Sequence, residues 1–345
     1  MQDTQTLLSI TRLKKHFPLP RTSLFRPRPY LRAVDGVTLD IKKGETLGLV
    51  GESGSGKSTL GRTVLQLYSA TEGSVRYFGR EREIELTKVK PKDLRALRKD
   101  LQIIFQDPYS SLNPRMTVGQ IIGEGVFTHK LSLKGDALRE YVLSVMKDCG
   151  LQEYALHRYP HQFSGGQRQR ICIARALALK PKFVVCDECV SALDVSIQSQ
   201  ILNLLSDLKE KEGLTYLFIS HDLSVVRHIS DRIAVLYLGK IVEIGEAEEV
   251  FSSPRHPYTV ALVSAIPSIE GGKEGKDRIF LPNNPPSGAL PSGCPFHPRC
   301  FMAQECCKKG EVPMEKVGEG HFVACHFARI PTKEKEDIAK KRKDI

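Results

Sequence analysis

The sequence contains no apolar run near the roughly 18 residues that a membrane-spanning helix needs. Its N-terminal segment, Met1–Ile10, also lacks the basic start and long apolar stretch of a secretory signal. We therefore expect the chain to remain inside the cell and to need a partner for any work at a membrane.

The composition is that of a globular protein. Apolar residues make up 41% of the 345 residues and charged residues 26%, which excludes disordered and collagen-like chains. The length predicts about two cores with appendages. With 51 basic and 40 acidic residues the net charge is +11, which favours nucleic acid, a nucleotide or an anionic membrane surface without choosing among them.

Alternating strand and helix patterns predict an α/β fold. Residues 31–50 hold two β-rich runs, and a helical pattern begins at Lys57. Apolar runs at 183–186 and 214–220 flank a helix, as expected of parallel βαβ units. Residues 107–165 carry helical stretches that predict a helical subdomain inserted in this α/β core.

Three later segments have distinct patterns. Residues 232–238 and 241–244 predict a hairpin. Six prolines between Leu281 and Pro298 are too many for a helix or central strand and predict an extended strap. Residues 331–345 form a charged tail, for which a solvated end is the default expectation.

A phosphate-binding loop is predicted at Gly51–Ser58. Its sequence, GESGSGKS, fits G-x-x-x-x-G-K-[ST], follows an apolar strand and precedes a helical pattern. Glycines let backbone N–H groups turn inward around the phosphates, while Lys57 bridges the β and γ groups and Ser58 binds Mg²⁺. The predicted ATP-binding residues of this segment are Gly51, Ser53, Gly54, Ser55, Gly56, Lys57, Ser58 and Thr59.

An acidic pair follows the apolar run that begins at Phe183. Asp187 is predicted to enter the Mg²⁺ shell, and Glu188 to stand beside the γ-phosphate, where a carboxylate can orient and polarise the attacking water. Strand ends often carry acids, so the pair is informative only in combination with the phosphate loop.

A second anion cradle is predicted at the start of the helical segment 163–177. Ser164 can cap that helix, and Gly165 and Gly166 allow a phosphate to approach the N–H groups closely. The alternative is an ordinary Ser-Gly-Gly turn before a helix. Since one phosphate loop already accounts for one nucleotide, the second cradle predicts a nucleotide held by another subunit, and hence a dimer.

With these motifs the chain resembles the ATP-binding subunit of an ABC transporter over nearly its whole length. The resemblance implies a P-loop (RecA-like) ATPase domain over residues 1–250, with an antiparallel β subdomain besides the inserted helical one. It implies nucleotide contacts for Gln167 and for Asp194, in a segment similar to the D-loop at the dimer seam. It also implies that Gln106 reaches Mg²⁺ and the attacking water, and that His221 holds the γ-phosphate.

At two positions the comparison with the family pattern leaves an alternative or shows a departure. The adenine-stacking aromatic residue of the family corresponds best to Phe17, for which packing against the first sheet is the alternative. The family commonly has Pro-Thr after the catalytic glutamate, and this chain has Cys189-Val190. Since Glu188 is intact, we expect hydrolysis to survive, with its rate open to change.

The C-terminal part points to one branch of the family. Residues 255–267 and 291–300 resemble the extension, here 251–330, of oligopeptide/dipeptide importers, which take up peptides and in some members nickel or sugars. The spacer after Phe17 resembles that of the F-type ATPase subunit. The implied partners are a second, different ATPase subunit, two transmembrane permease subunits and an extracytoplasmic peptide-binding protein, with this chain peripheral at the cytoplasmic face of the membrane.

Five of the nine cysteines lie between Cys294 and Cys325. The branch pattern implies that four of them ligate a [4Fe–4S] cluster, or alternatively Zn²⁺, with Cys306 as a rival for the third position. Four unrelated thiols are the remaining alternative. The four predicted ligands are Cys294, Cys300, Cys307 and Cys325, whereas Cys149, Cys172, Cys186 and Cys189 are expected to be core or incidental residues.

Two rival functions remain open at this point. A soluble ABC-type ATPase acting on nucleic acid or ribosomes is permitted by the charge, but such proteins usually carry two cassettes or a coiled-coil insertion. This chain has one cassette and no heptad repeat, so no nucleic acid partner is expected. A non-hydrolysing regulatory subunit is disfavoured by the intact Glu188 and His221. The transported molecule is selected by other subunits.

Overall fold

The computed structural model describes residues 5–21, 28–79, 83–131, 133–266, 278–281 and 291–341. Residues 282–290 of the predicted strap and 342–345 of the predicted tail lie outside these ranges. The chain forms two compact units with interleaved sequence. The first comprises Met1–Leu8, Asp40–Thr46 and Arg76–Ile219, and the second Ser9–Leu39, Leu47–Val75 and Ser220–Ile345.

A parallel sheet forms the core of the first unit. Strand β7 (Phe183–Asp187) pairs with β6 (Leu101–Ile104) on one side and with β8 (Thr215–Ile219) on the other, both in parallel. Every residue of β7 and β8 is buried, as continuous apolar runs require in a parallel sheet. Helix α7 (Val195–Glu212) connects β7 to β8, so the predicted βαβ unit is confirmed.

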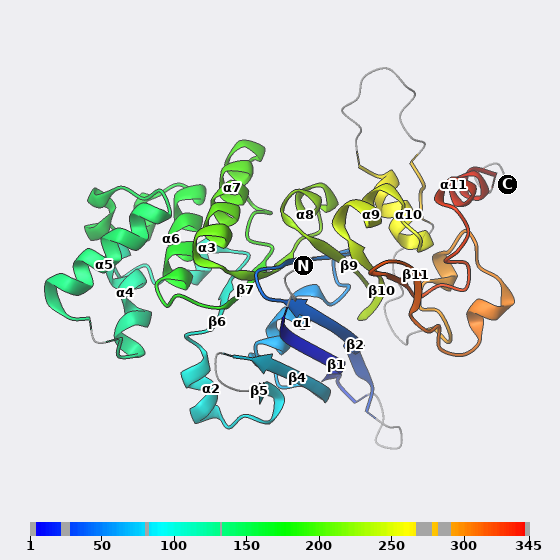
Figure 1. Ribbon diagram of the computed structural model, residues 1–345, viewed down its shortest axis with the longest axis horizontal. Helices are drawn as coiled ribbons and strands as arrows, with labels where there is room; N and C mark the ends of the chain where they lie inside the picture. The colour runs from blue at the N-terminus through cyan, green and yellow to red at the C-terminus, as the bar shows by residue number, and fades with distance from the viewer. Residues whose placement is uncertain are drawn as a thin grey trace. The chain divides into compact units, whose positions relative to one another are not determined.

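The helices of the first unit group around α6 (Gly165–Leu177), which contacts α3 (Pro108–Ser111), α4 (Val118–Thr128) and α5 (Gly135–Asp148) (Figure 1, green). Thr117 and Ser164 start α4 and α6 with capping boxes, which explains where these helices begin. The remaining short elements of this unit are β5 (Glu83–Glu85), η1 (Leu86–Lys88), α2 (Pro91–Leu97), η2 (Glu153–His157) and η3 (Pro160–Gln162).

The strands of the second unit lie in the order β11, β12, β10, β9, β3. Strand β3 (Thr46–Val50) runs parallel to β9 (Arg232–Tyr237), and β9 forms an antiparallel hairpin with β10 (Lys240–Glu246), as the sequence predicted. The C-terminal strands β11 (Glu315–Gly318) and β12 (His321–Val323) extend this sheet through antiparallel pairing of β12 with β10.

The other elements are described by their bounds. Strands β1 (Thr6–Pro18), β2 (Tyr30–Lys42) and β4 (Glu72–Phe78) each have residues in both units. The second unit also contains α1 (Lys57–Val64), α8 (Leu223–Ile229), α9 (Ala247–Ser252), α10 (Pro257–Ser264), η4 (His297–Arg299), η5 (Glu305–Lys308) and α11 (Thr332–Lys341).

The charged tail is not a solvated end over its described part, because it forms helix α11 against α10 (Figure 1, red and yellow). Lys335 is fully buried, and its Nζ donates to the carbonyl oxygens of Arg255 at 2.6 Å and Ile330 at 2.8 Å. Burial lowers the pKa of Lys335 to about 8. The carbonyl partners offset the cost of burying the amine, which local charge patterns cannot reveal.

Buried Glu243 of β10 fixes the start of α10. Its carboxylate accepts the N–H groups of Arg255 at 2.7 Å and His256 at 2.8 Å, and His321 of β12 lies 2.8 Å away. His256 in turn accepts the N–H of Tyr258 at its Nδ1, and burial lowers the pKa of His256 to about 3, so the ring stays neutral. This network holds Tyr258 at a fixed position in the second unit.

Candidate nucleotide-binding site

The predicted phosphate loop lies between buried strand β3 and helix α1. A Cβ atom at Gly51 would lie 2.2 Å from the carbonyl oxygen of Leu236, and one at Gly56 2.0 Å from that of Ala33. Both glycines also have positive φ, of 153° and 106°. The loop therefore needs glycine at these two positions for its path as well as for access to a ligand.

Lys57 is directed back over this loop. Its side chain is buried, and its Nζ donates to the carbonyl oxygens of Gly51 at 2.8 Å and Glu52 at 3.0 Å. The buried hydroxyl of Ser55 has no hydrogen-bond partner among the described residues. An inward cation, an unsatisfied hydroxyl and glycines at the turns fit a loop that binds phosphate oxygens.

Two residues outside the motifs also hold the phosphate loop, through contacts with Glu52. The N–H of Glu52 donates to the hydroxyl of Tyr258 at 2.8 Å. The guanidinium of Arg299 donates to both carboxylate oxygens of Glu52, at 2.8 and 3.0 Å. Glu52 occupies a position that the phosphate-loop pattern leaves open, so nothing in the local sequence indicates these contacts.

In the first unit, the structure brings Gln106 and Glu188 together. Both follow neighbouring parallel strands, β6 and β7, and Gln106 Nε2 donates to Glu188 Oε2 at 2.8 Å. Asp187 ends β7 and is buried, while Glu188 has the unusual φ of 49°. Such backbone conformations concentrate at functional sites. The carboxylate and amide oxygens of these first-unit residues are ligand types that Mg²⁺ prefers.

The residues of the predicted second cradle lie at the start of α6. Ser164 accepts the N–H of Gln167 at 3.4 Å, and the Gln167 side chain accepts the N–H of Ser164 at 3.0 Å. Ser164, Gly165 and Gln167 are exposed, whereas a Cβ atom at Gly166 would lie 2.5 Å from Ile197 of α7. Gly166 is thus required for helix packing, in addition to any role toward a phosphate.

Three further predicted residues are placed as follows. Exposed Asp194 caps α7 by accepting the N–H of Ile197 at 2.9 Å. His221 lies two residues after the end of β8 and is exposed. Phe17 is partly exposed at the end of β1 and packs edge to face on Tyr68, with ring centroids 5.6 Å apart. This contact is with a residue outside the sheet, and the role of Phe17 toward adenine stays a prediction.

The predicted [4Fe–4S] cluster, and its Zn²⁺ alternative, is wrong. Among the described residues no group of three or more His, Cys, Asp or Glu side chains is arranged to hold a metal ion, and all nine cysteines are free thiols. Burial raises the pKa of Cys300 to about 12 and of Cys325 to about 11. The cavity that these two share with Cys294 and Cys307 measures only about 10 Å³.

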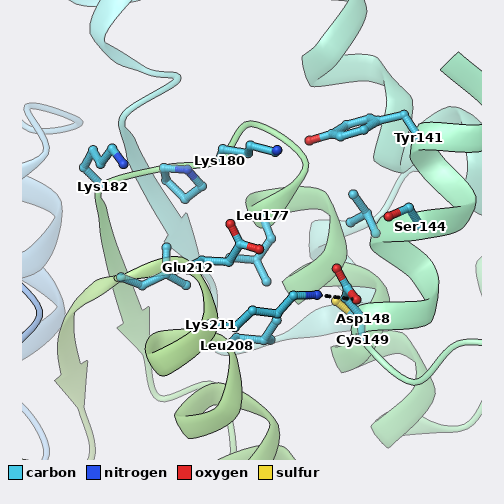
Figure 2. A pocket seen from close by; sticks show the side chains of 13 residues that line it. Tyr141, Ser144, Asp148, Cys149, Leu177, Lys180, Lys182, Leu208, Lys211 and Glu212 are labelled. Atoms are coloured by element: carbon cyan, nitrogen blue, oxygen red, sulfur yellow. Dashed lines mark hydrogen bonds and ion pairs between the residues drawn. The ribbon is translucent and has the colours of Figure 1, made fainter. Parts of the chain in front are cut away.

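A larger cavity, of about 290 Å³, lies in the first unit among α5, the end of α6 and the end of α7 (Figure 2). Tyr141, Lys180 and Lys211 are among the residues that line it, and Lys211 forms an ion pair with Asp148 at 2.7 Å. None of the motif residues lines this cavity, so it is separate from the predicted nucleotide site.

Over the part of the chain that the structure describes, no helix has both the length and the apolar composition that a membrane span needs.

A glycine loop of this geometry between a parallel strand and a helix places the chain among the P-loop nucleotide-binding proteins. A family model described as ABC transporter matches residues 34–191, and one described as oligopeptide/dipeptide transporter, C-terminal region, matches residues 242–307.

Comparison with individual proteins is more specific. The oligopeptide transport ATP-binding protein AppF of Bacillus subtilis (strain 168) is 48% identical over 94% of this chain and 98% of its own length. The corresponding protein OppF of Escherichia coli (strain K12) is 48% identical over 93% and 96%. A dimeric post-hydrolysis structure of the ATP-binding cassette MJ0796 bound to ADP and Pi superimposes with a TM-score of 0.62, at 29% identity over 70% and 99% of the two chains. The chain belongs to the ABC transporter family.

Proposed function

We propose that this chain is the ATP-hydrolysing subunit that energises peptide import through an ABC transporter. One observation carries the proposal: a single chain joins an ABC ATPase segment with a C-terminal region that matches oligopeptide/dipeptide transporters. Relatives that are 48% identical over nearly their full length are named for oligopeptide transport. The alternative of a soluble ATPase acting on nucleic acid or ribosomes is not favoured by any of these matches.

The proposed site divides the chemistry among the motif residues. Lys57 and the loop N–H groups bind the phosphates, and Phe17 stacks on the adenine. Ser58, Gln106 and Asp187 hold Mg²⁺, which neutralises phosphate charge when bound. Glu188, held by Gln106 at 2.8 Å, orients the attacking water, and His221 contacts the γ-phosphate.

The domain organisation is proposed on the same basis. Residues 1–250 form the ATPase domain, in which the helices within 107–165 make an inserted subdomain and the pairing of β4 with β5 belongs to an antiparallel β subdomain. Residues 251–330 form the importer-specific extension, and 331–345 a tail. In the complete transporter the subunit sits peripherally at the cytoplasmic face, with two permease subunits and an extracytoplasmic peptide-binding protein.

The exposed start of α6 supports pairing with a second ATPase subunit. Ser164, Gly165, Gly166 and Gln167, together with Asp194, are proposed to contact the ATP that the partner holds. Solved cassettes of similar fold are described as dimeric. In this arrangement each ATP is bound by the phosphate loop of one subunit and the Ser-Gly-Gly-Gln segment of the other.

Ser164→Ala in this chain, paired with a wild-type partner ATPase, should slow hydrolysis of the partner's ATP by about tenfold or more, because it removes one group that contacts phosphate. Site-specific hydrolysis in such mixed pairs measures the effect. Thr117→Ala is the matched control, since Thr117 forms the same kind of capping box at α4. Loss of hydrolysis only at this chain's own Lys57 would contradict the paired arrangement.

Peptide import is tested by purifying the tagged full chain from detergent-solubilised membranes. Two polytopic membrane proteins should copurify with it, and the complex in liposomes should take up labelled di- or oligopeptides only when ATP is supplied on the side of this subunit. Nickel and sugar uptake by the same liposomes separates the other cargoes of the branch. Copurification with ribosomes or nucleic acid in place of membrane proteins would refute the proposal.

A further inference from the structure

Residue Glu52 of the phosphate loop is bound by two residues from the C-terminal region. Arg299 donates two hydrogen bonds to its carboxylate, and Tyr258 accepts one from its N–H. Both residues lie in the segment 242–307 that matches the transporter C-terminal family model, and all three belong to the second unit. The importer-specific part of the chain therefore contacts the loop proposed to bind ATP.

Both contacts involve buried side chains. The Arg299 side chain is only 7% exposed, and a two-pronged arginine–carboxylate pair fixes orientation as well as distance. Burial disfavours the charge, but hydrogen bonds to Glu52 and Tyr237 outweigh it and raise the pKa of Arg299. Tyr258 is fully buried and packs on Tyr237 and Phe296, at centroid distances of 4.8 and 5.3 Å. Tyr258 is therefore held within an aromatic cluster.

The contacts bear directly on Lys57. The peptide bond between Gly51 and Glu52 is tied at both ends, since its C=O accepts from Lys57 at 2.8 Å and its N–H donates to Tyr258 at 2.8 Å. In a trans peptide these two groups point in opposite directions. Rotation of this peptide would break both hydrogen bonds at once. Tyr258 thus restrains the backbone that holds the amine of Lys57.

Charge gives Arg299 a second effect. A carboxylate on a loop that binds a polyphosphate repels the ligand, and the repulsion is strong where water is partly excluded. Arg299 neutralises the Glu52 carboxylate at 2.8 Å. Without Arg299, the loop would present an uncompensated negative charge to ATP.

We propose that Arg299 and Tyr258 are positioning residues of the ATPase, through which the C-terminal region orients the phosphate loop and sets its affinity for ATP. The inference rests on the proposed nucleotide site at this loop. A contact that serves only to attach the C-terminal region would affect unfolding temperature and leave ATP affinity unchanged.

Two variants of the full chain test the proposal by Mg-ATP titration and steady-state hydrolysis. Arg299→Gln should raise the Kd and KM for ATP about tenfold, with kcat at saturating ATP changed much less. Tyr258→Phe keeps the buried ring, removes the acceptor hydroxyl and should raise the Kd severalfold. Adding Glu52→Gln to Arg299→Gln should restore most of the affinity, because it removes the unpaired carboxylate.

Lys240→Gln provides the matched control. It breaks an ion pair with Glu311 at 3.1 Å, which also joins the hairpin to the C-terminal region but does not touch the loop, and should leave the Kd unchanged. Wild-type ATP affinity in Arg299→Gln and Tyr258→Phe would overturn the proposal. If Arg299→Gln does not fold, Tyr258→Phe alone decides: wild-type ATP affinity in that variant would overturn the proposal.

The proposed nucleotide site has its own separate test in Lys57→Ala. If Lys57→Ala weakens ATP binding and Arg299→Gln and Tyr258→Phe do not, only the positioning role fails. If Lys57→Ala itself leaves ATP affinity unchanged, the nucleotide site has been placed wrongly, and the positioning role falls with it.

Discussion

Glu188→Gln is expected to slow ATP hydrolysis by about 10²–10⁴-fold while leaving ATP affinity close to that of the wild type. The carboxylate follows the last residue of β7 and is held by the amide of Gln106 at 2.8 Å. Glutamine has nearly the same shape, so the loop and the phosphate contacts should persist. It lacks the negative charge that orients and polarises the attacking water, and this loss affects the reaction step alone.

Single-turnover phosphate release and Mg-ATP titration measure the two quantities separately. Glu153→Gln is a suitable control in the same unit, because Glu153 forms an exposed ion pair with Arg139 at 3.4 Å. A Glu188→Gln protein that hydrolyses ATP at the wild-type rate would move the role of orienting water to another residue. A large loss of ATP affinity would instead give Glu188 a binding role.

The two residues after Glu188, Cys189 and Val190, are the ones that depart from the family pattern. Cys189 and Val190, which replace the usual Pro-Thr, are both buried, with 2% of their surface exposed. They therefore belong to the core beneath the site. An effect of this replacement on the hydrolysis rate stays a prediction, since it would have to act through the backbone of Glu188.

Features that depend on short stretches of sequence were predictable. The apolar runs at 183–186 and 214–220 became parallel strands, because strand burial on both faces requires such runs. The glycines of the phosphate loop were predictable from their spacing, and their positive φ angles are a local requirement, whereas the close approach of Leu236 to Gly51 is not.

Features that depend on distant residues were not predictable. The contacts of Glu52 with Tyr258 and Arg299 span 206 and 247 residues of sequence. Lys335 looks like one more charge in a polar tail, yet its partners include the carbonyl of Arg255, 80 residues away. The cysteine pattern misled for a related reason, since spacing along the chain does not determine whether the sulfurs have room for a metal.

Lys57→Ala should weaken ATP binding by about a hundredfold or more, because it removes the one cation that the phosphate loop directs toward the β and γ phosphates. Hydrogen bonds to a charged partner contribute about 1.5–3 kcal/mol each, and two such bonds correspond to this change in affinity. The amine is buried and held over the loop by the carbonyl oxygens of Gly51 and Glu52, so it is already ordered before ATP binds.

Mg-ATP titration of the full chain measures this loss, and circular dichroism shows whether the fold is kept. Lys14→Ala is the matched control, since Lys14 lies in the same unit and forms a partly exposed ion pair with Glu72 at 2.7 Å. Such a solvent-screened pair contributes little to stability, and its removal should not change ATP affinity. Equal ATP affinity in folded Lys57→Ala and wild-type protein would refute the assignment of Gly51–Ser58 as the phosphate-binding loop.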